Sequence, residues 1–151
     1  MKKVIVFGLS VMFLLSCNNA TEKATTNLEK DDHATHQADD TSTAPELNNG
    51  EKWVVNQEMK PFVSKGEELV NAFVKNGQPD HKTLVQQLKD QNSALIKSCT
   101  MDGKSHDELH KWLHPHLELV KALENEADAA KANEIVLQLQ ESYRQYHQYF
   151  N

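Results

Sequence analysis

A line of histidines close to a cysteine and a methionine is the part of the chain best suited to chemistry. His106, His110 and His114 recur at four-residue steps, shortly after Cys99 and Met101. Residues four apart lie on one face of a helix, so two imidazoles at that spacing can hold one metal ion. Sulfur ligands add affinity for Cu(I), and zinc also accepts cysteine and histidine. The pattern therefore predicts a copper or zinc site. The predicted ligands are Cys99, Met101, His106 and His110, with His114, His116 or His147 completing the set.

The same segment does not predict an enzyme. His106-Asp107-Glu108-Leu109-His110 is close to the His-Glu-x-x-His pattern of zinc proteases, but Asp107 stands where the catalytic glutamate belongs. Its shorter side chain would misplace the general base. A phosphate-binding glycine loop and a Ser-His-Asp arrangement are also missing from the sequence, so we expect a non-enzymatic domain. Histidines also line the edges of ordinary amphipathic helices, which leaves open a cofactor-free structural or interaction bundle.

The first seventeen residues resemble the leader of a bacterial lipoprotein. Lys2 and Lys3 are basic, and residues 4–15 form a mainly apolar run. A membrane-spanning helix needs about 20 apolar residues, so this shorter run fits a signal-peptide core. It ends in Leu14-Leu15-Ser16-Cys17, which resembles the lipobox, where the chain is cut before an acylated cysteine. The sequence predicts a signal peptide at 1–16 and lipidation of Cys17; the alternative is an ordinary signal peptide with a free cysteine.

Lipidation of Cys17 would change the cysteine count of the exported chain. The sequence holds two cysteines, so Cys99 would lose its one intramolecular partner. An unpaired thiol in an exported protein indicates pairing with another chain, or a reactive or metal-binding role. This reasoning strengthens the prediction that Cys99 is a metal ligand.

The charge of the mature chain limits its partners. Removal of Lys2 and Lys3 leaves 14 basic against 22 acidic residues, a formal charge of −8. Nucleic-acid binding depends on cationic contacts to phosphate, so we exclude that class of partner. The predicted partners are the lipid bilayer, through acylated Cys17, and a metal ion. In lipoprotein sorting a residue other than Asp after the cysteine favours the outer membrane, so Asn18 implies attachment there, facing the periplasm.

Residues 17–50 are predicted to be the lipidated cysteine and a disordered linker. The stretch is polar and acidic, with Leu28 and Leu47 as its large apolar residues. Such a segment buries too little apolar surface to offset the entropy of ordering it. His33 and His36 lie among aspartates there, and they indicate either a weak metal-binding tail or a solvated spacer.

Residues 51–151 are predicted to form one domain of four amphipathic helices. Apolar residues recur at three- and four-residue steps over about 52–75, 80–98, 105–123 and 128–151. Gly77 and Pro79 separate the first two helices, and Ser105 with Glu108 forms a capping-box pattern that opens the third. Pro115 lies inside the third helix and predicts a kink. No stretch alternates with period two, so we expect no sheet.

Four such helices with short connections predict an all-α, up-down-up-down four-helix bundle. In that topology the start of the first and third helices and the end of the second and fourth lie together. Met59, Cys99, Met101, His106, His110 and His147 would then gather at one end, and His81 at the other.

The C-terminal helix resembles the last helix of soluble cytochrome b562. The similar part is Leu139 to Phe150, which includes Tyr146-His147-Gln148. In that family such a histidine and a methionine early in the first helix are the axial ligands of noncovalent haem b. The resemblance therefore implies an alternative function in electron transfer, with Met59 and His147 as the haem ligands. No Cys-x-x-Cys-His is present, so covalent haem is excluded.

The histidine-rich segment also resembles a stretch of certain exported bacterial lipoproteins. The shared pattern is Cys-x-Met, then Gly, His, Leu-His, Trp-Leu and Pro-His, found here between Cys99 and His116. This resemblance implies no particular activity. The function that the sequence favours is that of a membrane-anchored metal-binding module.

Overall fold

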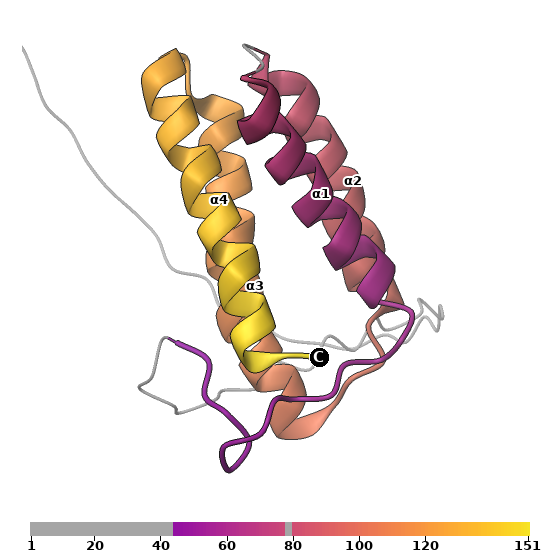
Figure 1. The fold of residues 1–151 in the computed structure, drawn as a ribbon. Coiled ribbons are helices and arrows are strands. Elements are labelled where there is room, and N and C mark those ends of the chain that lie inside the picture. Colours follow the sequence, from indigo (N-terminus) through magenta and orange to yellow (C-terminus); the bar gives the residue numbers. More distant parts are fainter. Residues whose placement is uncertain (1–43, 78–79) are drawn as a thin grey trace, which may run out of the picture. The chain divides into compact units, whose positions relative to one another are not determined.

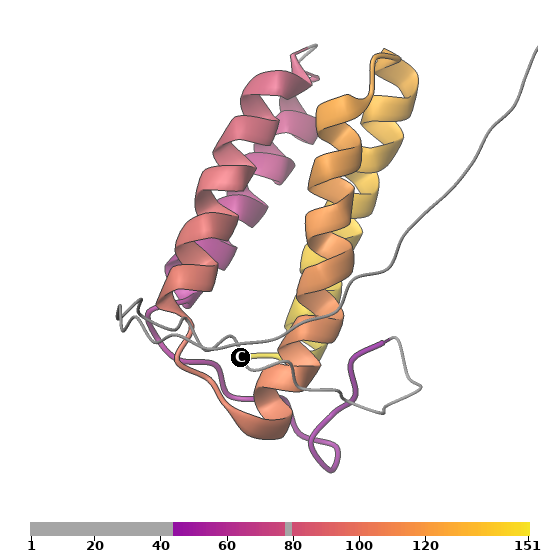
Figure 2. The same ribbon diagram turned by 180° about the vertical axis from the view of Figure 1, so that it is seen from behind.

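The described part of the chain is a bundle of four antiparallel helices. The computed structural model describes residues 44–77 and 80–151. The helices are α1 (Lys60–Asn76), α2 (His81–Ser98), α3 (Gly103–Asn125) and α4 (Ala129–Tyr149). Each helix packs against its neighbours in the sequence, and α1 also packs against α4 (Figure 1). The view from behind shows the same closed arrangement, with α2 and α3 in front (Figure 2). The predicted all-α four-helix bundle is confirmed.

Side-chain or glycine caps mark three of the eight helix ends. Asp80 accepts a hydrogen bond from the Lys82 N–H at the start of α2, and Asp128 does the same for Ala130 and Lys131 at the start of α4. Such caps satisfy backbone donors that have no partner within the helix. Gly77 ends α1 with a φ of 58°, in the left-handed region that favours glycine.

The first helix begins later than the sequence predicted. Residues 52–59 are not helical, and α1 begins at Lys60 with a proline in its first turn. Proline fits there because it has no N–H to donate and its φ already suits a helix. The prediction of a helix from 52 was wrong because it followed apolar spacing past this proline signal.

Instead, the segment before α1 crosses the end of the bundle as an extended strap. The Trp53 N–H donates to Tyr149 O at 2.7 Å, and the Asn151 N–H donates to Trp53 O at 3.1 Å. Glu46, which the sequence assigned to the linker, donates its N–H to Glu108 of α3. We call residues 44–59 the strap; it ties the start of the domain to its C-terminus.

The third helix differs from its prediction at its start. It begins at Gly103, with Asp102 as its N-cap, and the predicted capping box of Ser105 and Glu108 is not formed. Ser105 donates to Asp102 O instead, and Glu108 is buried with Lys111. The helix continues through Pro115 to Asn125, so the segment is one helix rather than two.

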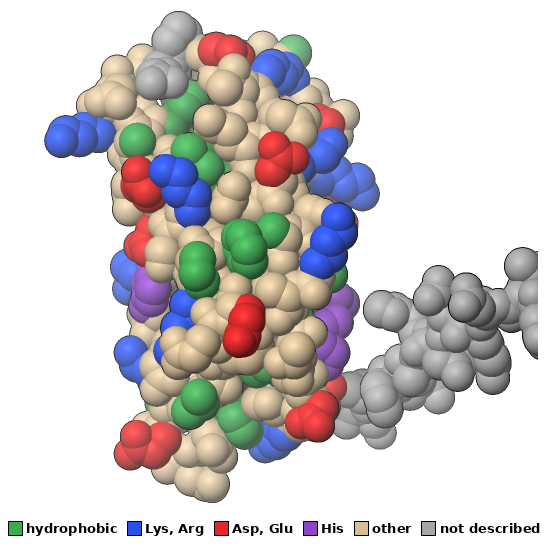
Figure 3. Space-filling view, turned by 90° about the vertical axis from the view of Figure 1, so that its right-hand side faces the viewer, with side chains coloured by type: hydrophobic (Ala, Val, Ile, Leu, Met, Phe, Trp, Pro, Cys, Tyr) green, Lys and Arg blue, Asp and Glu red, His purple; other side chains and the backbone are tan. Residues whose placement is uncertain are grey.

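The core runs the length of the bundle and is closed at the strap end by aromatic rings. The rings of Trp112, Tyr146 and Phe150 contact one another in series. The Trp112 and Tyr146 rings are tilted, with centroids 4.8 Å apart, and the Tyr146 and Phe150 rings are stacked, with centroids 5.2 Å apart. Gly66 allows α1 to approach α4, because a β-carbon at this position would collide with the hydroxyl of Tyr143. The face over α1 and α2 carries small groups of apolar side chains among charged ones, with histidine at both margins (Figure 3).

Candidate metal centre

The three histidines at four-residue steps form a line along one edge of α3. The ring centroids of His106 and His110 are 4.3 Å apart, and those of His110 and His114 are 4.9 Å apart. His106 and His110 are half-buried, whereas His114 is exposed. The apolar residues of α3 face the core, so this edge borders the core on one side and solvent on the other. The four-residue spacing correctly predicted that these histidines lie on one side of a helix.

A short loop brings the cysteine and methionine to the start of the same helix. Asn56 of the strap holds this loop, since its Nδ2 donates to Ser98 O at 2.9 Å and its Oδ1 accepts the Thr100 N–H at 3.2 Å. Gly103, with a φ of 55°, allows the turn from the loop into α3. Cys99 and Met101 are both half-buried and pack against the core.

The structure does not gather the predicted ligands into one set. Within residues 44–77 and 80–151, no three side chains of His, Cys, Asp and Glu are close enough to hold a metal ion together. Cys99 therefore does not join both His106 and His110 at one point. What the structure does provide is the pair His106 and His110, with His114 one turn further along.

His116 is closed off from this line of histidines. Its side chain is fully buried, stacked on Trp112 at 5.0 Å between ring centroids, and its Nδ1 lies 3.0 Å from the Ser142 hydroxyl. Burial lowers its pKa to about 4, so the ring is neutral at physiological pH. Serving as a ligand at the edge of α3 would require His116 to leave the core.

The residues proposed for haem have different surroundings. Met59 is fully buried, whereas the His147 side chain is 49% exposed, and its Nε2 lies 2.8 Å from Glu67 Oε2 of α1. His147 thus points to the bundle surface rather than into its core, and the strap end of the core is filled by Trp53, Tyr146 and Phe150. As placed, Met59 and His147 do not fit the two sides of a haem.

The sequence predicted a capping role for Glu108 of α3 but not its burial. Glu108 is 1% exposed, and its carboxylate accepts from Lys111 Nζ at 3.1 Å and from the Glu46 N–H at 2.7 Å. A buried carboxylate needs such partners to offset its loss of hydration. Its spacing of three from Lys111 and its position beside Leu109 are the sequence signals that could have indicated this buried pair.

Comparison of the chain with protein-family models, with curated protein sequences and with solved structures found no match. Across the described residues, no helix combines the length and apolar character that crossing a bilayer requires. The predicted signal peptide, Cys17, Asn18, His33 and His36 all lie outside the described residues.

Proposed function

We propose that this chain is an exported, lipid-anchored helical domain that binds a transition metal, copper or zinc, through His106 and His110. The observation that carries the proposal is the contact of their imidazole rings on adjacent turns of α3, 4.3 Å between centroids. Imidazole suits both metals, and a ligand pair on one helix is held in place by the backbone. The anchor is Cys17, and the location is the periplasmic face of the outer membrane.

A site with two protein ligands has open positions. Structural zinc sites use four protein ligands, whereas sites that exchange ligands keep positions for water or another molecule. A pair such as His106 and His110 therefore favours reversible capture of the ion over permanent storage. Cys99 and Met101, in the loop before α3, are the nearest sulfur atoms in sequence and extend the proposal to Cu(I).

The test is a metal titration of the mature chain, residues 17–151, with Cys17→Ser to prevent acylation. We expect one equivalent of Cu(II) or Zn(II) to bind, and His106→Ala/His110→Ala to weaken that binding about tenfold or more, a loss of at least about 1.4 kcal/mol. The matched control is His81→Ala, at the other end of α2, which should not change the affinity. Affinity for Cu(I) is measured separately with Cys99→Ser.

Two results would contradict the proposal. One is stoichiometric binding that the double variant does not change. The other is the absence of any rise in melting temperature with added metal, because an ion that binds the folded state stabilises it by mass action.

A further inference from the structure

A groove between α2 and α3 is separate from the line of histidines. Its volume is about 430 Å³, within the range of about 300–1,000 Å³ that is typical of small-molecule sites. Residues of α2 from Lys89 to Lys97 form one wall, and residues of α3 from Leu117 to Glu124 form the other. Eight residues of helix rise about 12 Å, which sets the length of the groove.

The floor of the groove is apolar but contains one buried amide. Ile96, Leu117 and Val120 supply the apolar surface, and Ile96 is 49% exposed. Asn92 lines the groove and is 6% exposed, yet its Nδ2 has no hydrogen-bond partner in the part of the chain that the structure describes. A buried N–H donor without an acceptor costs free energy, because it has lost its hydrogen bond to water. An acceptor atom of a bound molecule would remove this cost.

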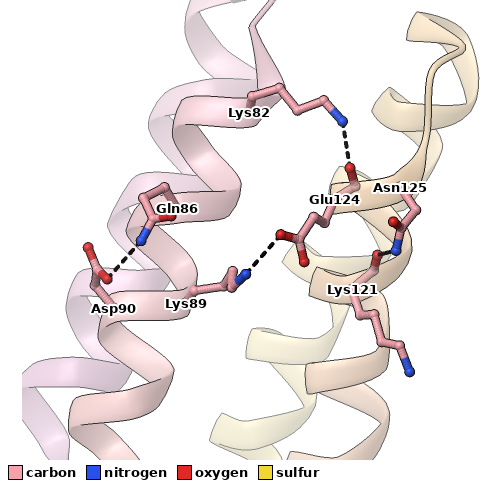
Figure 4. Close-up of polar contacts among 7 residues, drawn as sticks. All are labelled: Lys82, Gln86, Lys89, Asp90, Lys121, Glu124 and Asn125. Carbon is pink, nitrogen blue, oxygen red and sulfur yellow. Dashed lines mark hydrogen bonds and ion pairs between the residues drawn. The ribbon is translucent and has the colours of Figure 1, made fainter.

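The rim of the groove is basic in a chain that is acidic overall. Three lysines line it against one glutamate, although the formal charge of the chain is −6. Lys89 pairs with Glu124 at 2.8 Å across the groove (Figure 4), whereas Lys97 makes no ion pair or hydrogen bond within the described residues. The Lys97 ammonium can therefore pair with a bound anion without breaking an existing ion pair.

We propose that this groove binds an amphipathic monocarboxylate, which is an acyl chain with a carboxylate head. The acyl chain covers Ile96, Leu117 and Val120. The carboxylate gives Asn92 its missing acceptor and pairs with a rim lysine, of which Lys97 is the unengaged one. The apolar floor selects against small anions, and the basic rim selects against cationic and neutral amphiphiles.

The test uses decanoate, whose extended chain is about as long as the groove, below its critical micelle concentration. The protein is the mature chain with Cys17→Ser, which keeps every described residue. We expect saturable 1:1 binding, with amide NMR shifts concentrated in residues 89–97 and 117–124. Decylamine and 1-decanol, which have the same chain length, should bind at least about tenfold more weakly.

Two variants and one control separate this site from general hydrophobic binding. Lys97→Glu reverses an exposed charge, and Asn92→Leu removes the donor while keeping a side chain of similar size; each should raise the Kd for decanoate about tenfold. Lys75→Glu, on α1 away from the groove, changes the net charge equally and should leave the Kd unchanged. Equal effects of Lys97→Glu and Lys75→Glu, equal binding of decylamine, or amide shifts centred outside residues 89–97 and 117–124 would overturn the proposal.

Discussion

His116 is the residue whose surroundings depart most from those of an ordinary histidine. It lies in the core between α3 and α4, stacked on Trp112 and in edge contact with Tyr143 at 4.8 Å. Its Nε2 has no partner within the described residues, so the only polar contact shown for the ring is the Ser142 hydroxyl. A neutral ring tolerates this environment, and a charged ring does not.

This burial makes the stability of the bundle depend on pH. The pKa of His116 falls from 6.5 to about 4 on folding, so between these values the unfolded chain binds more protons than the folded one. The contribution of neutral His116 to the free energy of unfolding is therefore fully present above pH 6.5, and it is lost as the pH falls toward 4. We expect the free energy of unfolding in urea to drop by about 2 kcal/mol from pH 7.5 to pH 5 through His116 alone.

The control for this effect is His116→Leu, which carries no titrating group. Between pH 7.5 and pH 5, the free energy of unfolding of this variant should fall by about 2 kcal/mol less than that of the unmodified chain. This comparison holds whatever the absolute stability of the variant. An unchanged pH dependence in His116→Leu would show that other groups cause the loss of stability.

At the scale of the helices, Gly66 marks a close contact between α1 and α4. In Gly66→Ala the new methyl group meets the buried Tyr143 hydroxyl, whose ring is fixed by Trp112 and His116. Overpacking costs about 1–3 kcal/mol, and the better helix propensity of alanine returns about 1 kcal/mol, so we expect a net loss of about 1 kcal/mol in urea unfolding. The same substitution in a Tyr143→Phe background should cost less, because the hydroxyl is gone; an identical cost would place the strain elsewhere.

The strap stabilises the bundle through contacts between the N-terminal part of the domain and its C-terminus. Trp53 is buried, pairs its backbone with Tyr149 and Asn151, and donates its indole N–H to Glu46 O at 2.7 Å. Trp53→Ala removes this packing and should lower the free energy of unfolding by about 3 kcal/mol. The neighbouring Val54 is 71% exposed, so Val54→Ala should change it by less than about 0.5 kcal/mol. Similar losses in the two variants would mean that the strap does not depend on the Trp53 ring.

The strap also shows why local patterns predicted α2 and α4 better than the start of α1. The caps Asp80 and Asp128 and the apolar spacing are local, and both helices begin within a residue of their predicted positions. The pairing of Trp53 with Tyr149 joins residues that are far apart in sequence, and no spacing within residues 52–59 indicates it.

For the candidate site, too, the sequence predicted relations within one helix but not relations between helices. Four-residue spacing correctly placed His106, His110 and His114 on one edge of α3, because that relation is local to one helix. It did not predict the burial of His116, which depends on the packing of α4 over α3, nor the exposure of His147. The groove at Asn92 depends on how two helices meet, and no single-helix pattern contains that information.

At the scale of the whole molecule, the proposed attachment to the membrane depends on the predicted N-terminal leader. None of the described helices is long and apolar enough to cross a bilayer. The anchor that we propose is the acyl group on Cys17, and it rests on the lipobox-like Leu14-Leu15-Ser16-Cys17. The 26 residues between Cys17 and Ala44 span at most about 90 Å when fully extended, which would keep the domain close to the membrane surface. The chain then enters the bundle through the strap, whose Glu46 contacts the same helix that carries His106 and His110.

Cys17→Ser should therefore release the protein from the membrane. We expect the native chain to incorporate labelled palmitate and sediment with the membrane fraction, and Cys17→Ser to do neither, because a single uncleaved apolar run of twelve residues is too short to span stably. Cys99→Ser is the matched control, since it removes the other thiol and leaves the leader intact; it should keep both the label and the membrane location. Palmitate label that persists in Cys17→Ser and disappears in Cys99→Ser would reverse the assignment of the two cysteines, and with it the argument that Cys99 is the thiol left for metal.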